Sequence, residues 1–193
     1  MAEADRERWN ARWRDEPSPP PSAFVTGLAD LLPGSGRALD AGGGTGRHAL
    51  WLARRGLDVT LADVSDVALA RAVRAAREEG LALRTLAIDL ENSALPAGPW
   101  DVVLCTYFLH RPLLAAAAKA LAPGGLLAVA HATRRNLERH PRPGPRHVLE
   151  DGELPGLVAG LEILRSEEGW MEEGRHEARL VARRPAGDGG RRP

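Results

Sequence analysis

Short apolar runs alternate with longer helical patterns through the middle of the chain. Five of these runs are typical of strands, at 37–40, 57–63, 81–89, 100–105 and 126–130, and helical periodicity occurs at 47–55, 67–79 and 112–121. Such alternation predicts parallel strands joined by crossover helices, which the right-handed crossover rule places on both faces of a doubly wound sheet.

The last two apolar segments, 161–167 and 178–182, are too close together for a crossover helix between them. They are expected to pair as an antiparallel hairpin at the sheet edge. Before them, the polar, proline-rich stretch 134–147 predicts a long loop and 153–160 a short helix. The predicted fold is therefore α/β, with a doubly wound, mostly parallel seven-stranded sheet, helices on both faces and a C-terminal antiparallel hairpin.

The N-terminal region differs from this repeat. Residues 1–16 are charged, and Trp9 and Trp13 lie four positions apart, which places both on one face of a short helix. The proline-rich stretch 17–22 predicts a stiff connector, followed by an apolar helical segment at 23–32. We expect a helical N-terminal segment over 1–33, one α/β domain over 34–184 and a disordered tail over 185–193.

Composition narrows the functional classes. The chain has 26 basic and 26 acidic side chains, and this neutral balance argues against a dedicated nucleic-acid binder. The lack of a long apolar run and the charged N-terminus predict a soluble, cytoplasmic protein that does not span a membrane. The single cysteine, Cys105, excludes an internal disulfide, and the six histidines show no metal-ligand spacing, so no metal site is expected.

The strongest local signal is the segment from Asp40 to His48, DAGGGTGRH, which follows a strand and opens a helix. Glycines there allow a tight turn and close approach of the backbone to a ligand, and the free N–H groups of a helix start suit a polar or anionic group. Residues 44–49, GTGRHA, also fit the dinucleotide fingerprint G-x-G-x-x-G/A, with Asp63 about 20 residues on as the ribose-binding acid. A P-loop is excluded because no Gly-Lys-Ser/Thr follows.

Two features favour S-adenosylmethionine over a dinucleotide. Asp40 precedes the first glycine, where a carboxylate would repel a pyrophosphate but attract the ammonium of a methionyl group. The chain is also short for a nicotinamide enzyme with a substrate domain. A short NAD(P)-dependent reductase stays as an alternative, although Tyr107 is followed by Arg111 where such an enzyme needs lysine. A non-catalytic S-adenosylmethionine-binding module is the other alternative.

The motifs LDAGGGTGRHAL, LADVS, AIDL and WDVVLC together resemble class I S-adenosylmethionine-dependent methyltransferases with a Rossmann-like fold, over nearly all of 37–184. The resemblance implies that Asp40 and the glycines line the methionyl end, that Asp63 binds the ribose and that Asp89 lies at the adenine. The cofactor residues expected on this basis are Trp13, Asp40, Ala41, Gly42, Gly44, Gly46, Asp63, Val64, Asp89, Leu90, Thr106 and Tyr107. Asp63 has a structural alternative as a cap of the helix near Ser65, and Asp89 as a loop acid.

A narrower resemblance rests on WNARWR, on Tyr107-Phe108-Leu109-His110-Arg111-Pro112-Leu113 and on GRHEA at 174–178. These segments are similar to the small tellurite-resistance and thiopurine-type methyltransferases. In that group the N-terminal aromatic segment folds over the cofactor, which implies that Trp13 and Arg14 belong to a lid.

The side chains of His110 and Arg111 follow the fourth strand, at the edge where open α/β sheets bind ligands. They are the candidate catalytic pair, placed to orient an acceptor or remove its proton. His131 ends the fifth strand, and the arginines of the following loop either bind an anionic acceptor or form a solvated surface. No Asn/Asp-Pro-Pro-Tyr/Phe motif follows the fourth strand, which favours a small-molecule acceptor such as a thiol or oxyanion over a nucleic acid.

Overall fold

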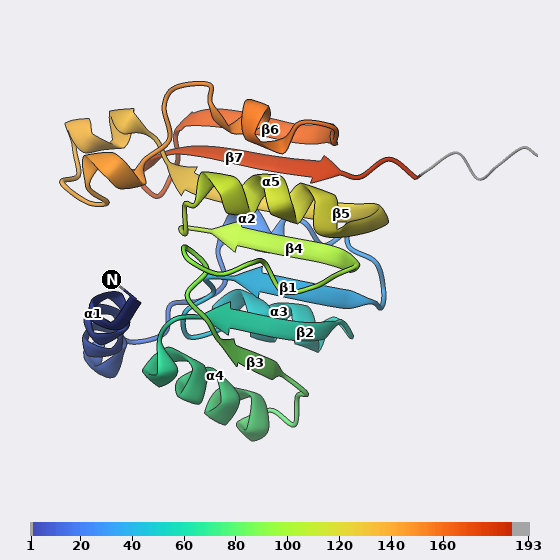
Figure 1. Ribbon diagram of the computed structural model, residues 1–193. Coiled ribbons are helices and arrows are strands. Elements are labelled where there is room, and N and C mark those ends of the chain that lie inside the picture. Colours follow the sequence, from blue (N-terminus) through green and yellow to red (C-terminus); the bar gives the residue numbers. More distant parts are fainter. Residues whose placement is uncertain (1, 187–193) are drawn as a thin grey trace, which may run out of the picture.

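A computed structural model describes residues 2–186 and shows one seven-stranded sheet with the order β3-β2-β1-β4-β5-β7-β6 (Figure 1). All neighbouring strands are parallel except β7, which runs antiparallel to β5 and β6. This confirms the predicted mostly parallel sheet with its C-terminal hairpin. The strands are β1 (Arg37–Ala41), β2 (Asp58–Asp63), β3 (Arg84–Ala87), β4 (Trp100–Thr106), β5 (Leu121–Ala132), β6 (Glu162–Trp170) and β7 (His176–Arg183).

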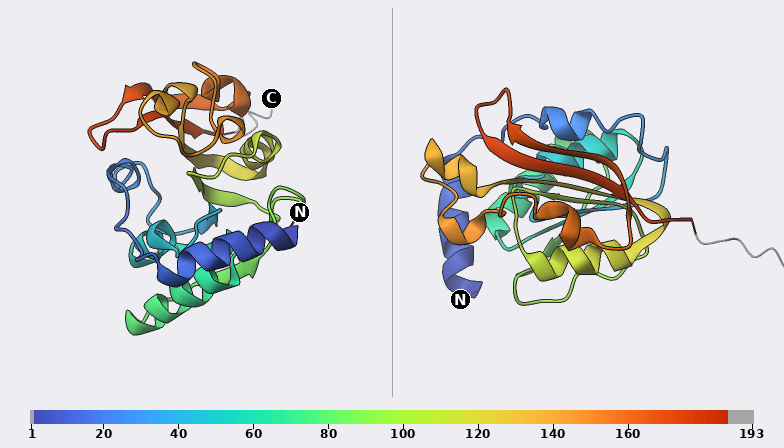
Figure 2. Two further views of the ribbon diagram at one scale, coloured as in Figure 1. Left: turned by 90° about the vertical axis from the view of Figure 1, so that its left-hand side faces the viewer. Right: turned by 90° about the horizontal axis from the view of Figure 1, so that it is seen from above.

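Helices cover both faces of the sheet, as the alternating pattern predicts (Figure 2). On one face, α2 (Ala23–Thr26), α3 (Arg47–Arg54) and α4 (Asp66–Glu78) pack on a core that includes Leu61 and Leu104. On the other face, α5 (Arg111–Ala120) and the 3-10 helix η3 (Leu154–Val158) pack on a core that includes Leu39 and Val103. Successive strand residues thus enter opposite cores, because side chains alternate along a strand.

The N-terminal helix α1 (Ala2–Asp15) packs on α4 rather than on the sheet. When the carboxyl ends of the parallel strands face the viewer, α1 crosses this edge on the β2 and β3 side, and the 3-10 helices cover the opposite side (Figure 2). Because α1 is mostly polar, this position across a functional edge suits it better than a place in the core.

Several boundaries differ from the prediction. The second helical segment ends at Thr26, since Gly27 caps α2 and irregular turns follow to residue 32. The predicted loop contains the 3-10 helices η1 (Arg134–Glu138) and η2 (Pro145–His147), and the predicted short helix at 153–160 is the 3-10 helix η3. The hairpin strands are longer than the apolar runs that mark them: β6 extends to Trp170, and β7 begins with the buried polar residues His176 and Glu177. Of the tail predicted to be disordered, 187–193 lie outside the described residues.

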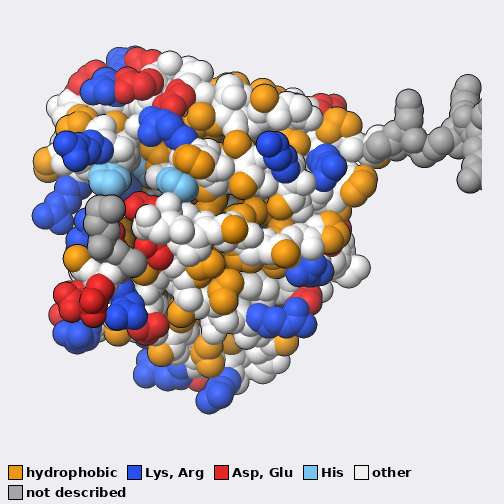
Figure 3. Space-filling model, in the orientation of Figure 1, with side chains coloured by type: hydrophobic (Ala, Val, Ile, Leu, Met, Phe, Trp, Pro, Cys, Tyr) orange, Lys and Arg blue, Asp and Glu red, His pale blue; other side chains and the backbone are white. Residues whose placement is uncertain are grey.

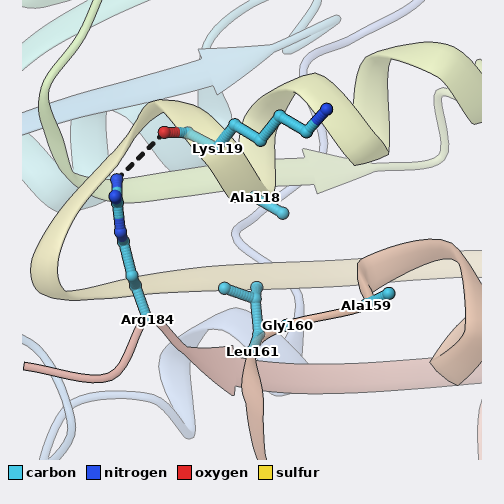
Figure 4. A pocket seen from close by; sticks show the side chains of 6 residues that line it. All are labelled: Ala118, Lys119, Ala159, Gly160, Leu161 and Arg184. Carbon is cyan, nitrogen blue, oxygen red and sulfur yellow. Dashed lines mark hydrogen bonds between the residues drawn. The ribbon is translucent and has the colours of Figure 1, made fainter. Parts of the chain in front are cut away.

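One cavity lies away from the glycine turn, and another lies beside it. One of about 230 Å³ lies near the amino ends of the parallel strands, where the Arg184 guanidinium donates to the carbonyls of Lys119 and Leu121 (Figure 4). The other, of about 410 Å³, lies between the proline-rich connector and α3. None of the helices within 2–186 is long and apolar enough to cross a bilayer.

Candidate functional site

The loop between β1 and α3 is built on glycines in conformations that other residues rarely adopt. Gly42, Gly44 and Gly46 have φ angles of +68°, +57° and +77°, in the left-handed region where an L side chain is strained. The loop stays joined to the sheet because Gly42 N donates to Ala62 O at 2.8 Å. The sequence motif therefore corresponds to a tight turn at the carboxyl edge of the sheet.

The same glycines admit close aromatic neighbours. A Cβ atom on Gly42 would lie 2.6 Å from Phe108 Cβ, and one on Gly44 would lie 3.0 Å from the Trp13 ring. The structure therefore brings Trp13 of α1 to the glycine loop, together with Phe108 from the segment after β4. Phe108 is a neighbour of the loop that the sequence analysis quoted in a motif without giving it a role.

Asp40 lies under the glycine loop and is completely buried. Its Oδ2 accepts a hydrogen bond from Ala49 N at 3.1 Å, while its Oδ1 has no hydrogen-bond partner among the described residues. Burial raises the pKa of this carboxyl to about 7, although the Ala49 N–H opposes the shift. Only glycine fits at position 43, because a Cβ atom there would overlap Asp40 Oδ2.

Asp63 at the end of β2 connects the glycine loop to the start of α4. Its Oδ2 accepts from Gly44 N at 2.8 Å and its Oδ1 accepts from Ser65 N at 2.9 Å. Burial raises the pKa of Asp63, and these two N–H donors act against that rise. Ser65 itself caps α4, since its Oγ accepts from Ala68 N. Asp63 thus supports the helix start and borders the glycine loop at once.

Asp89 lies beside Asp63, because Ile88 N donates to Asp63 O at 2.9 Å. The carboxylate of Asp89 accepts from Glu91 N at 3.0 Å and from Asn92 Nδ2 at 2.7 Å. These bonds fix a local turn at the carboxyl edge. The structure thus brings Asp40, Asp63 and Asp89 to the ends of three adjacent strands.

Three of the predicted cofactor residues have apolar side chains with different surroundings. Ala41 is buried completely and Leu90 almost completely, both in the core on the α5 face, whereas Val64 is half-buried. Ala41 and Leu90 can therefore offer a ligand little beyond their backbone. Val64 retains an accessible side chain next to Asp63.

Thr106 at the end of β4 is joined to α3 and to the N-terminal connector through His48. Ser22 N donates to His48 Nε2 at 3.2 Å, so His48 Nδ1 carries the hydrogen and donates to Thr106 Oγ1 at 3.0 Å. Burial lowers the pKa of His48 to about 3, which keeps the ring neutral. His48 is not among the residues predicted from the sequence, although it ends the segment from Asp40 to His48.

Tyr107 follows β4 with a φ of +58°, a strained conformation for a residue other than glycine. Its hydroxyl donates to Glu177 Oε2 at 3.4 Å, and Arg179 Nε donates to the same oxygen at 2.9 Å. Glu177 and Arg179 are both buried. Burial, followed by the nearby Glu177 charge, raises the pKa of the Tyr107 phenol.

The predicted catalytic pair lies at the start of α5. Arg111 forms a bidentate ion pair with Glu153 through Nε and Nη2, and Nη2 also donates to Val148 O at 3.2 Å. His110 is half-buried, and its Nδ1 is enclosed without a hydrogen-bond partner among the described residues. The Arg111 guanidinium therefore holds the loop after β5, whereas the His110 ring has no such engagement.

His131 at the end of β5 is buried, and its burial lowers the pKa of the imidazole to about 4. The sequence left open an anion-binding cluster of arginines in the loop after β5, but two of these arginines have glutamate partners. Arg134 is paired with Glu150, and Arg135 lies 3.4 Å from Glu138. The positive charges of Arg134 and Arg135 are therefore balanced by glutamates.

Helix α1 is held over the site by polar contacts that the sequence analysis did not identify. Arg71 Nη1 on α4 donates to the carbonyl oxygens of Trp13 at 2.5 Å and Glu16 at 2.6 Å. Asn10 Oδ1 accepts from Ser65 Oγ at 2.7 Å. Asn10 lies three positions before Trp13, and this spacing places both side chains on the same face of the helix. The spacing is the sequence feature from which a contact of Asn10 could have been predicted.

Charged and histidine side chains gather at the carboxyl edge in the space-filling view, at the left of the molecule (Figure 3). Over residues 2–186 no group of three or more His, Cys, Asp and Glu side chains is placed to hold a metal ion. Cys105 is buried, and burial raises the pKa of its thiol to about 12. A thiolate nucleophile is therefore not formed at neutral pH.

Comparison with known proteins identifies the domain. Residues 38–125 match the model of a family described as a methyltransferase domain. Over these residues the chain is similar to a methyltransferase domain. The match begins in β1 and ends in the turn within β5, so it contains the glycine loop, Asp63, Asp89 and Thr106.

Curated relatives and a solved structure agree with this domain. The chain is 37% identical over 105 residues to glycine/sarcosine N-methyltransferase of Halorhodospira halochloris, which covers 49% of this chain and 39% of that protein. It is 32% identical over 127 residues to tRNA 5-carboxymethoxyuridine methyltransferase of Escherichia coli K12, covering 58% and 46%. The chain thus spans less than half of the length of these relatives. TehB from Haemophilus influenzae has the same fold, with a TM-score of 0.71 at 22% identity over 85% of this chain and 62% of that one.

The cofactor that this domain implies is S-adenosylmethionine, and the residues at the glycine loop fit it. The orphaned Oδ1 of Asp40 is an acceptor that an ammonium group would satisfy. The glycine loop forms a surface that any Cβ would obstruct, and Asp63 and Asp89 supply carboxylates at the next two strand ends.

Proposed function

We propose that this protein is an S-adenosylmethionine-dependent methyltransferase that acts on a small-molecule acceptor by in-line transfer. The observation that carries the proposal is the arrangement around Asp63, whose carboxylate joins the glycine loop at Gly44 N to the start of α4. This arrangement leaves the buried carboxylate of Asp40 under the loop with one oxygen still unpaired among the described residues. A ligand with a cationic group at one end and hydroxyl groups at the other would suit these two carboxylates, the cation at Asp40 and the hydroxyls at Asp63.

Methyl transfer requires alignment of the reacting atoms and exclusion of water more than it requires a reactive side chain. The bound cofactor supplies an electrophilic methyl group on a sulfonium. Asp40 would bind the methionyl ammonium, Asp63 the ribose hydroxyls and Asp89 the adenine side. Trp13 and Phe108 flank the glycine loop and would exclude water from it.

Proton removal is needed only when the acceptor is an alcohol or amine. His110 and His131 are the candidate bases at this edge, and the low pKa of His131 keeps its imidazole neutral at pH 7. Arg111 would then act by fixing the loop after β5 through Glu153 rather than by direct contact with the acceptor. A thiolate or another anionic acceptor would need neither histidine.

A small molecule is preferred over tRNA as the acceptor on the basis of charge. The chain has no net charge, and the basic side chains Arg111, Arg134 and Arg179 at the carboxyl edge are paired with glutamates. Proteins that bind nucleic acid derive much of their affinity from unpaired basic surfaces. One of the relatives is a tRNA methyltransferase by name, so tRNA belongs in the acceptor panel.

The test is calorimetric titration of the purified protein with S-adenosylhomocysteine and, in parallel, with NADH. We expect micromolar binding of S-adenosylhomocysteine alone, weakened at least tenfold in Asp63→Ala. Asp66→Ala is the matched control. It removes the same charge as Asp63→Ala, but from an exposed residue in the first turn of α4. Methyl transfer from S-adenosylmethionine to thiols, phenols, amines and bulk tRNA then identifies the acceptor class.

Binding of NADH in place of S-adenosylhomocysteine would overturn the proposal and indicate an NAD(P)-dependent reductase. Cofactor binding without turnover on any acceptor would favour a binding module. Turnover on tRNA alone would retain the methyltransferase and overturn the small-molecule acceptor.

A further inference from the structure

The Tyr107 ring is held rigidly at the end of β4, where the proposed acceptor would meet the cofactor. Its backbone N donates to Ala130 O at 2.8 Å, and its hydroxyl donates to Glu177. A left-handed conformation costs a residue such as tyrosine about 1–2 kcal/mol, so the surrounding contacts must maintain it. The ring is therefore a fixed wall of the site.

Two guanidinium groups converge on this ring from distant parts of the chain. The Arg47 Cζ lies 5.3 Å from the ring centroid, and the Arg175 Cζ lies 5.9 Å from it. Arg47 is the first residue of α3, and Arg175 lies in the turn between β6 and β7. Within residues 2–186, neither guanidinium has a carboxylate within 4 Å.

The acidic groups that face the ring already have partners. Glu177 lies 2.9 Å from Arg179, which also contacts Glu173 at 3.2 Å and Glu167 at 3.7 Å. Asp40 also faces Arg47, but it is buried under the glycine loop. After this pairing, the positive charges of Arg47 and Arg175 are the ones left without a counter-ion at Tyr107.

We infer that Arg47 and Arg175 bind a carboxylate group of the methyl acceptor, against the face of the site formed by Tyr107. The inference rests on the proposed function and names the chemical class of its acceptor. Guanidinium groups bind carboxylates with planar, paired hydrogen bonds, and both of these groups lie within 6 Å of the Tyr107 ring centroid. Among the described residues, the Arg47 side chain donates one hydrogen bond, from Nη1 to Pro20 O at 3.2 Å.

The sheet order separates Arg175 from the cofactor residues, whereas Arg47 directly follows Gly46 of the glycine loop. In the order β3-β2-β1-β4-β5-β7-β6, Asp40, Asp63 and Asp89 lie at the carboxyl ends of β1, β2 and β3, whereas Arg175 precedes β7 on the other side of β4. A carboxylate held by Arg175 therefore lies on the acceptor side of the site. The methionyl carboxylate of the cofactor is the competing source of the same chemistry.

The experiment uses the full-length protein saturated with S-adenosylhomocysteine and titrated with benzoate or benzamide in a calorimeter. Benzoate and benzamide have nearly the same shape and differ in charge. We expect benzoate to bind at least tenfold more tightly than benzamide. We expect Arg175→Gln and Arg47→Gln each to weaken benzoate binding at least fivefold, and Arg175→Gln to leave the affinity for S-adenosylhomocysteine unchanged.

Arg134→Gln is the matched control, because it removes the same charge from the same edge but at a residue paired with Glu150. Equal binding of benzoate and benzamide, or equal loss in Arg134→Gln and Arg175→Gln, would overturn the inference. A parallel loss of S-adenosylhomocysteine affinity in Arg175→Gln would assign the anion to the cofactor and also overturn it. If S-adenosylhomocysteine itself does not bind, the proposed function fails, and titration of the free protein with benzoate still decides whether the anion site exists.

Discussion

Asp40 is the residue whose surroundings differ most from those of an ordinary carboxylate. It is buried, receives one hydrogen bond from Ala49 N, and has a pKa raised to about 7 by burial. Around neutral pH, a population with a protonated, uncharged carboxyl therefore coexists with an ionised one. A cationic ligand group would bind the ionised form and stabilise it.

The affinity for S-adenosylhomocysteine should consequently depend on pH near neutrality. Below pH 7 Asp40 takes up a proton and loses the charge that attracts the ammonium, so the affinity should fall about tenfold between pH 8 and pH 6. Isothermal titration across this range measures the effect. Asp40→Asn keeps an oxygen for Ala49 N and should bind weakly with no pH dependence, whereas an unchanged pH profile in this variant would contradict the role of Asp40.

The glycines allow a second test at the scale of single residues. Gly42 and Gly152 have nearly the same backbone conformation, with φ of +68° and +71°. A Cβ on Gly42 would lie 2.6 Å from Phe108, whereas nothing lies within 4 Å of a Cβ on Gly152. The pair therefore separates backbone strain from steric overlap.

We expect Gly152→Ala to lower the free energy of unfolding by about 1 kcal/mol through strain alone. Gly42→Ala should cost about 1–3 kcal/mol more, because Phe108 must move, and should weaken S-adenosylhomocysteine binding at least tenfold. Chemical denaturation and calorimetry measure the two effects. Equal behaviour of the two variants would show that the contact between Gly42 and Phe108 does not shape the site.

Which residues the sequence identified depends on how far apart the partners are. The glycine motif and Asp63 were predictable, because a strand, a turn and a helix start follow one another within a short segment. The contact of Tyr107 with Glu177 spans 70 residues, and the link from Ser22 to His48 spans 26. No local pattern reports such a contact, since it depends on the strand order and on where the N-terminal connector passes.

At the scale of elements, α1 is a polar helix that is joined to α4 by specific hydrogen bonds. Arg71 on α4 donates to the carbonyls of Trp13 and Glu16 at the C-terminal end of α1, and Asn10 accepts from Ser65. The helix is mostly polar and does not enter either core. Its position over the glycine loop therefore depends on a few hydrogen bonds.

Loss of Arg71 should release α1 without unfolding the sheet. In Arg71→Gln we expect trypsin to cleave after Arg12 and Arg14 at least fivefold faster than in the parent protein, and S-adenosylhomocysteine affinity to fall about fivefold. Arg74→Gln is the control, because Arg74 lies one turn further along α4 and its ion pair among the described residues is with Glu78, on the same helix. Identical digestion of the two variants would mean that Arg71 does not hold α1.

Element boundaries were predictable where a strong local signal ends an element. Ser65 and Gly46 flank helices whose predicted and observed starts agree closely. Of the 3-10 helices between β5 and β6, only η3 coincides with a predicted short helix; η1 and η2 were not predictable, because such short turns have no helical periodicity. Their positions depend on distant contacts such as the ion pair of Arg111 with Glu153, 42 residues apart.

At the scale of the whole molecule, buried ionisable groups of opposite kinds determine how stability responds to acid. The pKa of His48 is lowered to about 3 and that of His131 to about 4, whereas the pKa of Asp40 is raised to about 7. Below pH 6.5 these two histidines bind protons in the unfolded chain but stay neutral in the folded protein. Their contribution to the free energy of unfolding therefore falls. Asp40 acts in the opposite direction between about pH 7 and 4, because the folded form binds the proton more tightly.

His48→Gln separates these opposing contributions. The parent protein loses about 2 kcal/mol of stability at His48 between pH 7.5 and pH 5.0, since protonation of the ring in the unfolded chain has no counterpart in the folded one. The variant is expected to be less stable at pH 7.5, because it weakens the link from Ser22 through residue 48 to Thr106. Between pH 7.5 and 5.0, however, its free energy of unfolding should change about 2 kcal/mol more favourably than that of the parent. Urea denaturation at the two pH values measures this difference, and a parallel response of the two proteins would show that the folded His48 accepts a proton as readily as the unfolded chain.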